Sequence, residues 1–111
     1  RRVHFPGLED HPGHDVARRQ MSGYPGMLSF ELKSGEAARA VSARTRFFKL
    51  AESLGGTASL IELPWLMSHA SMSEEARLAC GITPGLVRLS IGLEDPEDLV
   101  EDLAAALDGA P

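Results

Sequence analysis

The segment 47–63, FFKLAESLGGTASLIEL, decides how the rest of this chain is interpreted. Its pattern predicts the end of an amphipathic helix at 47–51, a Ser-Leu-Gly-Gly turn at 53–56 and an apolar strand at 58–63. Glycine adopts backbone angles that other residues resist, and it lets another backbone or a ligand approach closely. A polar junction between two rigid elements is a common location for a functional site. The simpler interpretation is a helix C-cap followed by a tight turn.

Length and composition indicate one domain, residues 1–111, with one modest core. No apolar run is long enough to cross a bilayer, so we expect no membrane partner. The net charge is −5 and the basic residues are scattered, which argues against nucleic acid. Cys80 is the only cysteine, which excludes an internal disulfide and fits a cytoplasmic location. The chain begins Arg1-Arg2-Val3 without an initiator Met, so we expect a fragment of a longer protein.

Hydrophobic periodicity predicts an α+β fold. We expect a small, mostly antiparallel or mixed sheet of three to four strands, with helices packed on one face. The expected strands are 27–32, 58–63 and 86–93, after a short extended piece at 3–8. The expected helices cover 12–21, 36–51, the residues between Ser73 and Gly81, and the residues between Asp95 and Gly109.

Apolar stripes on these elements predict which side chains are buried. The apolar stripe of the helix 36–51 consists of Ala37, Val41, Phe48 and Ala51, together with Ala40 and Phe47. In the strand 86–93 and the last helix, the expected buried residues are Val87, Leu89, Ile91, Leu93, Leu99, Val100, Leu103, Ala106 and Leu107.

Arg88 is the strongest candidate for a binding residue. It shares one face of its strand with Ser90 and Gly92, which we expect to leave open space in front of the guanidinium. A planar guanidinium binds a carboxylate through two parallel hydrogen bonds. The alternative is a salt bridge to one of the 16 acidic residues. Spacing alone does not separate these interpretations.

Glu52 and Ser53 lie in the junction between helix and strand, where a hydroxyl and backbone N–H groups would help to bind the same carboxylate. The alternatives are an ordinary surface acid and a capping hydroxyl. Ser68 and His69 lie in an expected loop at 65–72, and a lone loop histidine is more often structural or exposed. From its residues alone, the chain has half of a carboxylate-binding site and no reactive centre.

Other reactive side chains form no recognisable site. His4, His11 and His14 do not have the spacing of a known metal site, so we expect no metal. Cys80 is expected to be a small buried residue rather than a nucleophile.

Six motifs occur in order along the chain: FPGLEDHPGHDVARRQMSG, GMLSFELKSG, LAESLGG, SLIELP, MSHAS and GITPGLVRLSIGLEDPEDLVEDLAAAL. Together they closely resemble the C-terminal part of the pyridoxal-phosphate-dependent transsulfuration enzymes. This family includes cystathionine gamma-synthase, cystathionine gamma-lyase, methionine gamma-lyase and the homoserine-ester sulfhydrylases. The resemblance extends over 3–107 and implies the small domain of a fold-type I enzyme.

The resemblance also implies roles for four residues. Arg88, in VRLSIG, matches the arginine that binds the substrate α-carboxylate. Ser53, in ESLGG, matches the residue that helps to hold this carboxylate. Glu52 matches a position that faces the substrate, and Ser68 stands where most members have Thr beside the same pocket.

Three residues of this chain depart from the family pattern, and these departures bear on which substrate is preferred. Pro25 stiffens the turn at 23–27, Leu63 replaces a usual His, and Trp65 replaces a usual small residue. The ESLGG motif favours the cystathionine gamma-synthase and gamma-lyase side over the sulfhydrylases and methionine gamma-lyase. The implied substrate is therefore cystathionine or an activated homoserine, with elimination or replacement at its β or γ carbon.

The cofactor machinery of the family is missing from this chain. The family requires pyridoxal phosphate bound to a lysine, but Lys33 and Lys49 do not match its lysine motif. The resemblance implies that an N-terminal domain holds the cofactor, that residues 1–111 alone are inactive, and that the full enzyme is a homotetramer. The alternative is a free-standing, non-catalytic module that binds a ligand or a protein.

Overall fold

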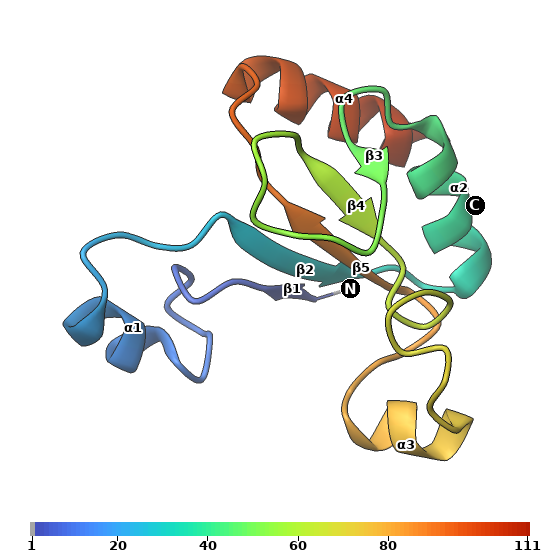
Figure 1. The fold of residues 1–111 in the computed structure, drawn as a ribbon, viewed down its shortest axis with the longest axis horizontal. Coiled ribbons are helices and arrows are strands. Elements are labelled where there is room, and N and C mark those ends of the chain that lie inside the picture. Colours follow the sequence, from blue (N-terminus) through green and yellow to red (C-terminus); the bar gives the residue numbers. More distant parts are fainter. Residues whose placement is uncertain (1) are drawn as a thin grey trace.

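A five-stranded mixed sheet forms the centre of the computed structural model, which describes residues 2–111 (Figure 1). The strand order is β1-β2-β5-β4-β3. Neighbouring strands are antiparallel, except for the parallel pair β3 and β4. The strands are β1 Val3–His4, β2 Met27–Glu31, β3 Lys49–Leu50, β4 Leu60–Glu62 and β5 Leu86–Ser90.

The predicted α+β class and mixed sheet are confirmed, but the sheet has more strands than expected within the described residues. β1 lies in the short extended piece expected at 3–8, and the unexpected strand is β3; both have two residues and lie at the edges. A strand this short has no measurable alternation of apolar and polar residues, so periodicity cannot reveal it.

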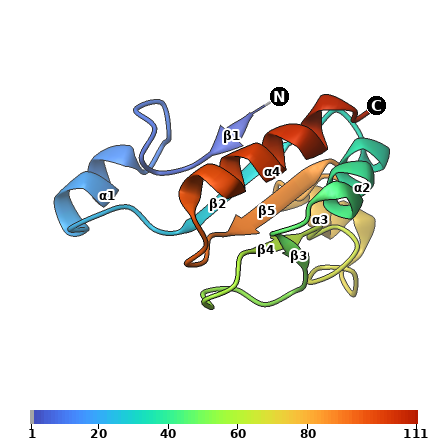
Figure 2. The same cartoon turned by 90° about the horizontal axis from the view of Figure 1, so that it is seen from above.

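Two of the helices cover one face of the sheet (Figure 2). These are α2, Gly35–Arg44, and α4, Pro96–Asp108. The other two, α1 His14–Gln20 and α3 Glu74–Ala79, lie beyond the sheet at separate ends of the molecule (Figure 1). The expectation of helices on one face therefore holds for α2 and α4 only. No helix within residues 2–111 is both long and apolar enough to span a bilayer.

The caps of α3 and α4 agree with the sequence prediction. The Ser73 hydroxyl accepts a hydrogen bond from the backbone N–H of Ala76, and the Asp95 carboxylate accepts one from Glu97. These side chains satisfy N–H groups that have no partner inside the helix.

The core lies between the sheet and the pair α2 and α4. Its buried members are Phe30, Ala38, Val41, Phe48, Ile61, Leu63, Val87, Leu89, Leu99 and Ala106. Four residues of the predicted apolar stripes are exposed instead: Leu93 at 83%, Val100 at 69%, Phe47 at 42% and Leu107 at 37%. Leu93 lies beyond the end of β5, and α4 turns Asp102 inward. Cys80, expected to be buried, is an exposed free thiol.

The predicted helix 36–51 ends at Arg44, seven residues early, because of a buried carboxylate on α4. The oxygens of Asp102 accept backbone hydrogen bonds from Arg46, Phe47 and Phe48 at 2.7, 2.9 and 3.3 Å. Bonds to Asp102 replace the helical bonds that these N–H groups would otherwise make. The chain then enters β3, so the predicted direct passage from helix to turn is wrong.

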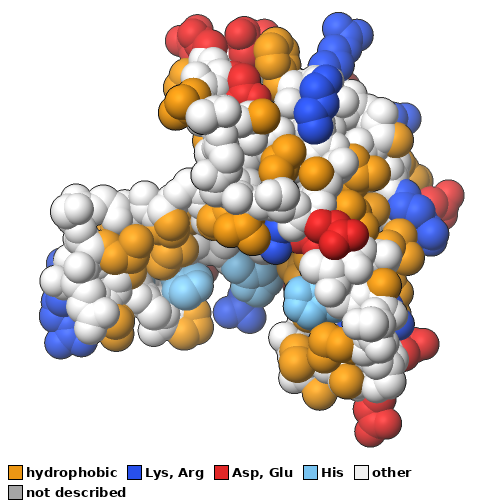
Figure 3. Space-filling view, viewed as in Figure 1, with side chains coloured by type: hydrophobic (Ala, Val, Ile, Leu, Met, Phe, Trp, Pro, Cys, Tyr) orange, Lys and Arg blue, Asp and Glu red, His pale blue; other side chains and the backbone are white. Residues whose placement is uncertain are grey.

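Charged side chains are dispersed on the face of the molecule seen in Figure 3. Lys and Arg side chains occur at separate places there, with acidic and apolar side chains between them. This face therefore offers no continuous basic surface.

Candidate functional site

Arg88 and Glu62 form an ion pair on the sheet face opposite the core. They are direct cross-strand neighbours in β5 and β4, and side chains alternate along strands, so both point away from Val87 and Leu89. Arg88 Nη2 lies 2.6 Å from Glu62 Oε2, and the Arg88 side chain is 20% exposed. Arg88 therefore makes a salt bridge within this chain, and its binding of a ligand carboxylate stays a prediction.

The same nitrogen of Arg88 also contacts the loop between β3 and β4. Nη2 donates to the backbone carbonyls of Glu52 at 2.9 Å and Ser53 at 3.3 Å. Glu52 and Ser53 therefore reach Arg88 through their carbonyls, while both residues are exposed. Every hydrogen bond and ion pair that the Arg88 side chain makes within residues 2–111 uses Nη2. The Nε and Nη1 atoms of its guanidinium are left for other acceptors.

Ser68 joins the group through Glu62. The backbone N–H of Ser68 donates to Glu62 Oε1 at 3.1 Å, and its hydroxyl lies 2.7 Å from His69 Nδ1. The structure therefore brings together all four residues singled out from the sequence. Their roles toward a substrate remain a prediction.

The expected open space beside Arg88 is wrong, because Ser90 and Gly92 hold the loop 51–59 against β5. The Ser90 hydroxyl accepts a hydrogen bond from Gly55 at 2.8 Å, and Gly92 donates to the Ser59 hydroxyl at 2.8 Å. A Cβ at Gly92 would lie only 2.3 Å from the Thr57 carbonyl oxygen. These small residues thus allow a close backbone approach that fixes the loop in front of Arg88.

Glu94 fastens the end of the same loop. Its carboxylate accepts hydrogen bonds from the Ser59 backbone at 2.9 Å and the Ser59 hydroxyl at 2.8 Å. The Ser59 backbone bond, the N–H of Glu94 itself and the Ser59 hydroxyl favour the charged form and lower the pKa of Glu94 below its ordinary value.

Sequence reasoning missed Glu62 as a site residue. It is 1% exposed, although glutamate is almost never fully buried unless it is paired. A glutamate inside the apolar strand SLIEL was an available signal, but its partner depends on the register of β4 and β5, which the sequence does not give.

Comparisons with known proteins place the chain in a family. A family model for the Cys/Met metabolism PLP-dependent enzymes matches residues 1–108. The chain belongs to this family. Cystathionine beta-lyase of Lactococcus lactis subsp. cremoris is 50% identical over 96% of this chain and 28% of its own length. The chain therefore spans about 28% of the length of such curated relatives.

Two solved structures of cystathionine enzymes have the same fold. Cystathionine gamma-synthase of Xanthomonas oryzae pv. oryzae, solved in complex with cystathionine, is 56% identical with a TM-score of 0.91, and the match covers 96% of this chain and 28% of that one. The cystathionine gamma-lyase CalE6 of Micromonospora echinospora is 46% identical with a TM-score of 0.92, over 99% and 29% of the two chains.

The residues of this family member do not by themselves fit pyridoxal phosphate. Lys49 donates its amine to the Arg46 carbonyl at 2.8 Å, and Lys33 is exposed after β2. Neither lysine hydrogen-bonds to Arg88 or Glu62 in the described part of the chain. Residues 2–111 also contain no group of three His, Cys, Asp or Glu side chains that would hold a metal ion.

Trp65, a departure from the family pattern, is held by α3. The Arg77 guanidinium lies 3.9 Å from the centre of the Trp65 ring and donates to the Trp65 carbonyl. This cation–π contact attaches the segment 64–72, which contains Ser68, to α3. The segment forms a series of turns, as the sequence predicts.

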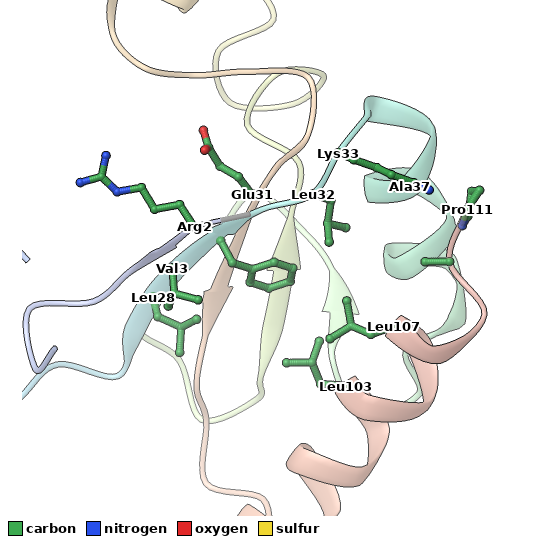
Figure 4. A pocket seen from close by; sticks show the side chains of 12 residues that line it. Arg2, Val3, Leu28, Glu31, Leu32, Lys33, Ala37, Leu103, Leu107 and Pro111 are labelled. Atoms are coloured by element: carbon green, nitrogen blue, oxygen red, sulfur yellow. The ribbon is translucent and has the colours of Figure 1, made fainter. Parts of the chain in front are cut away.

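A separate apolar cavity of about 410 Å³ lies between β2 and α4 (Figure 4). Leu28, Leu103 and Leu107 project into it (Figure 4). None of Arg88, Glu62, Glu52, Ser53 and Ser68 lines this cavity. It is therefore distinct from the polar group around Arg88.

Proposed function

We propose that this chain is the domain of a pyridoxal-phosphate-dependent transsulfuration enzyme that binds the α-carboxylate of the amino-acid substrate through Arg88. The geometry of the guanidinium carries the proposal. Its Nη2 is held by Glu62 and by the carbonyls of Glu52 and Ser53, and its Nε and Nη1 remain without a partner in residues 2–111. The N–H groups of Nη1 on this fixed guanidinium can donate a charge-assisted hydrogen bond to a carboxylate oxygen.

Arg88 serves to orient the substrate. Holding the α-carboxylate fixes the amino acid in one pose, so that the bond to be broken keeps its alignment through the reaction. The cofactor, when bound in the longer enzyme, supplies the electron sink for cleavage at the β or γ carbon. We place it in the remainder of that enzyme, the expected N-terminal domain, with residues 1–111 at the C-terminal end.

The names of the relatives support cystathionine as the substrate. The lyases among them, cystathionine beta-lyase and gamma-lyase, are named for cleaving cystathionine, whereas the gamma-synthase is named for making it, and a putative O-acetylhomoserine (thiol)-lyase is 38% identical. We favour cystathionine over an activated homoserine because the more similar proteins carry its name. We also propose that the longer enzyme is a homotetramer.

Substitution of Arg88 tests the proposal in the longer enzyme that it requires. We expect Arg88→Ala to raise the KM for cystathionine about 10- to 100-fold, since a charge-assisted hydrogen bond contributes about 1.5–3 kcal/mol. Arg39→Ala is the matched control, because Arg39 is exposed on α2. An unchanged KM and kcat in Arg88→Ala would show that the carboxylate binds elsewhere.

A further inference from the structure

Glu62 is a buried carboxylate whose two oxygens face donors from two different elements. Oε2 lies 2.6 Å from Arg88 Nη2 on β5, and Oε1 accepts the backbone N–H of Ser68 in the segment after β4. Oε2 has no aligned hydrogen bond within residues 2–111, so its contact with Arg88 is an ion pair. Burial of a charge is costly, and a buried ion pair is weak evidence for a gain in stability. Glu62 therefore calls for a role other than stability.

We propose that Glu62 is a positioning residue that fixes the orientation of the Arg88 guanidinium toward the substrate. This inference rests on the proposed function of Arg88. Glu62 and the carbonyls of Glu52 and Ser53 surround a single nitrogen, Nη2. A rotation of the guanidinium would break these contacts. Nη1 is thereby held ready to donate to the α-carboxylate.

Glu62 also fixes the distance between β5 and the segment 64–72, which lie on two sides of the site. Because one carboxylate holds both Arg88 and the Ser68 backbone, the segment 64–72 and β5 cannot move apart without loss of one contact. The cation–π contact of Arg77 with Trp65 anchors the other end of this segment. Ser68 is thus kept beside the carboxylate site by its backbone.

Only a carboxylate satisfies both neighbours of Glu62. Arg88 and the Ser68 backbone both present N–H donors, and an ionised carboxylate offers an acceptor on each oxygen. A glutamine has one acceptor and one donor group, so either orientation of its amide places a donor against a donor. Glu62→Gln therefore keeps the size of the side chain but releases either Arg88 or Ser68. Aspartate keeps both acceptors on a shorter side chain.

A double-mutant cycle in the longer enzyme tests this role, with cystathionine as the substrate. We expect Glu62→Gln to raise KM about 10-fold with kcat changed less than about 3-fold, and Glu62→Asp to recover part of the loss. The double variant Glu62→Gln with Arg88→Ala should bind no worse than Arg88→Ala alone, because Glu62 acts through Arg88. Glu101→Gln is the control, since Glu101 is exposed on α4 and lies outside the site.

Each contrary outcome has a distinct meaning. A KM that stays normal in Glu62→Gln but rises in Arg88→Ala overturns the role of Glu62 and leaves the proposed function standing. Additive losses in the double variant also overturn it, because they indicate action on something other than Arg88. Failure of both Glu62 variants to fold, measured by thermal unfolding, would assign Glu62 a purely structural role. A normal KM in Arg88→Ala would instead overturn the proposed function.

Discussion

At the scale of single residues, Asp102 determines where α2 ends. Its carboxylate accepts three backbone N–H groups from residues 46–48, and its side chain is buried in α4. The sequence predicted a longer helix because the apolar stripe continues to Phe48, whereas Asp102 lies more than 50 residues away. Local periodicity contains no information about a partner at that distance.

Asp102→Ala is expected to lower the free energy of unfolding by about 2–4 kcal/mol, because buried N–H donors lose their acceptor. Urea denaturation measures this change. Glu101→Ala, one position earlier and exposed on the same helix, should change it by less than about 0.5 kcal/mol. Equal effects of the two variants would contradict the assigned role of Asp102.

Gly92 is a second residue with a structural role, because the backbone of another segment packs closely against it. A methyl group there would approach the backbone of Thr57 and Ala58 at 2.3 and 2.6 Å. Gly92→Ala should therefore destabilise the protein by about 1–3 kcal/mol. At Gly23 an added Cβ meets nothing within 4 Å, so Gly23→Ala should leave the melting temperature nearly unchanged. A Gly92→Ala variant as stable as Gly23→Ala would refute the close approach.

At the scale of elements, the loop 51–59 is held in front of Arg88 by the end of β5. Glycines at 55 and 56 suggested a turn at this place, and the positive φ of 73° at Gly55 agrees with it. The sequence also pointed to Arg88, Glu52, Ser53 and Ser68 as neighbours. It did not reveal that Ser90 and Gly92 bind the loop. The sequence places both residues on one face of the strand, but it does not say which segment of the chain packs against that face.

The attachment of this loop through Glu94 should depend on pH. Since folding lowers the pKa of Glu94 below its ordinary value of 4.5, its contribution is fully present above pH 4.5 and is lost as the pH falls through the lowered value. The difference in unfolding free energy between the wild type and Glu94→Gln should therefore shrink on acidification from pH 7 to pH 3. A difference in unfolding free energy that stays constant between pH 7 and pH 3 would show that Glu94 does not make the attachment of the loop depend on pH.

At the scale of the whole molecule, the two sheet faces have different partners. The helices α2 and α4 cover the face of Val87, Leu89 and Ile61, and the opposite face carries Arg88 and Glu62. Alternating strands already predicted a second face that meets water or another domain. The pairing of Glu62 with Arg88 required the strand register, so it became visible only in the fold.

The proposed enzyme also predicts the size of the protein in its source cells. Relatives are between three and four times as long as the matched segment, so we expect an intact mass several times that of 111 residues. Intact mass spectrometry of the natural protein measures it. A mass equal to that of this chain would favour the free-standing, non-catalytic module.

The central claim is that Arg88 binds the substrate α-carboxylate, and a crystal structure of the longer enzyme with cystathionine tests it most directly. The account predicts an α-carboxylate oxygen within about 3.2 Å of Nη1 of Arg88, with Glu62 still paired to Nη2. A carboxylate bound to another residue, with Arg88 contacting only Glu62 and the loop carbonyls, would contradict it.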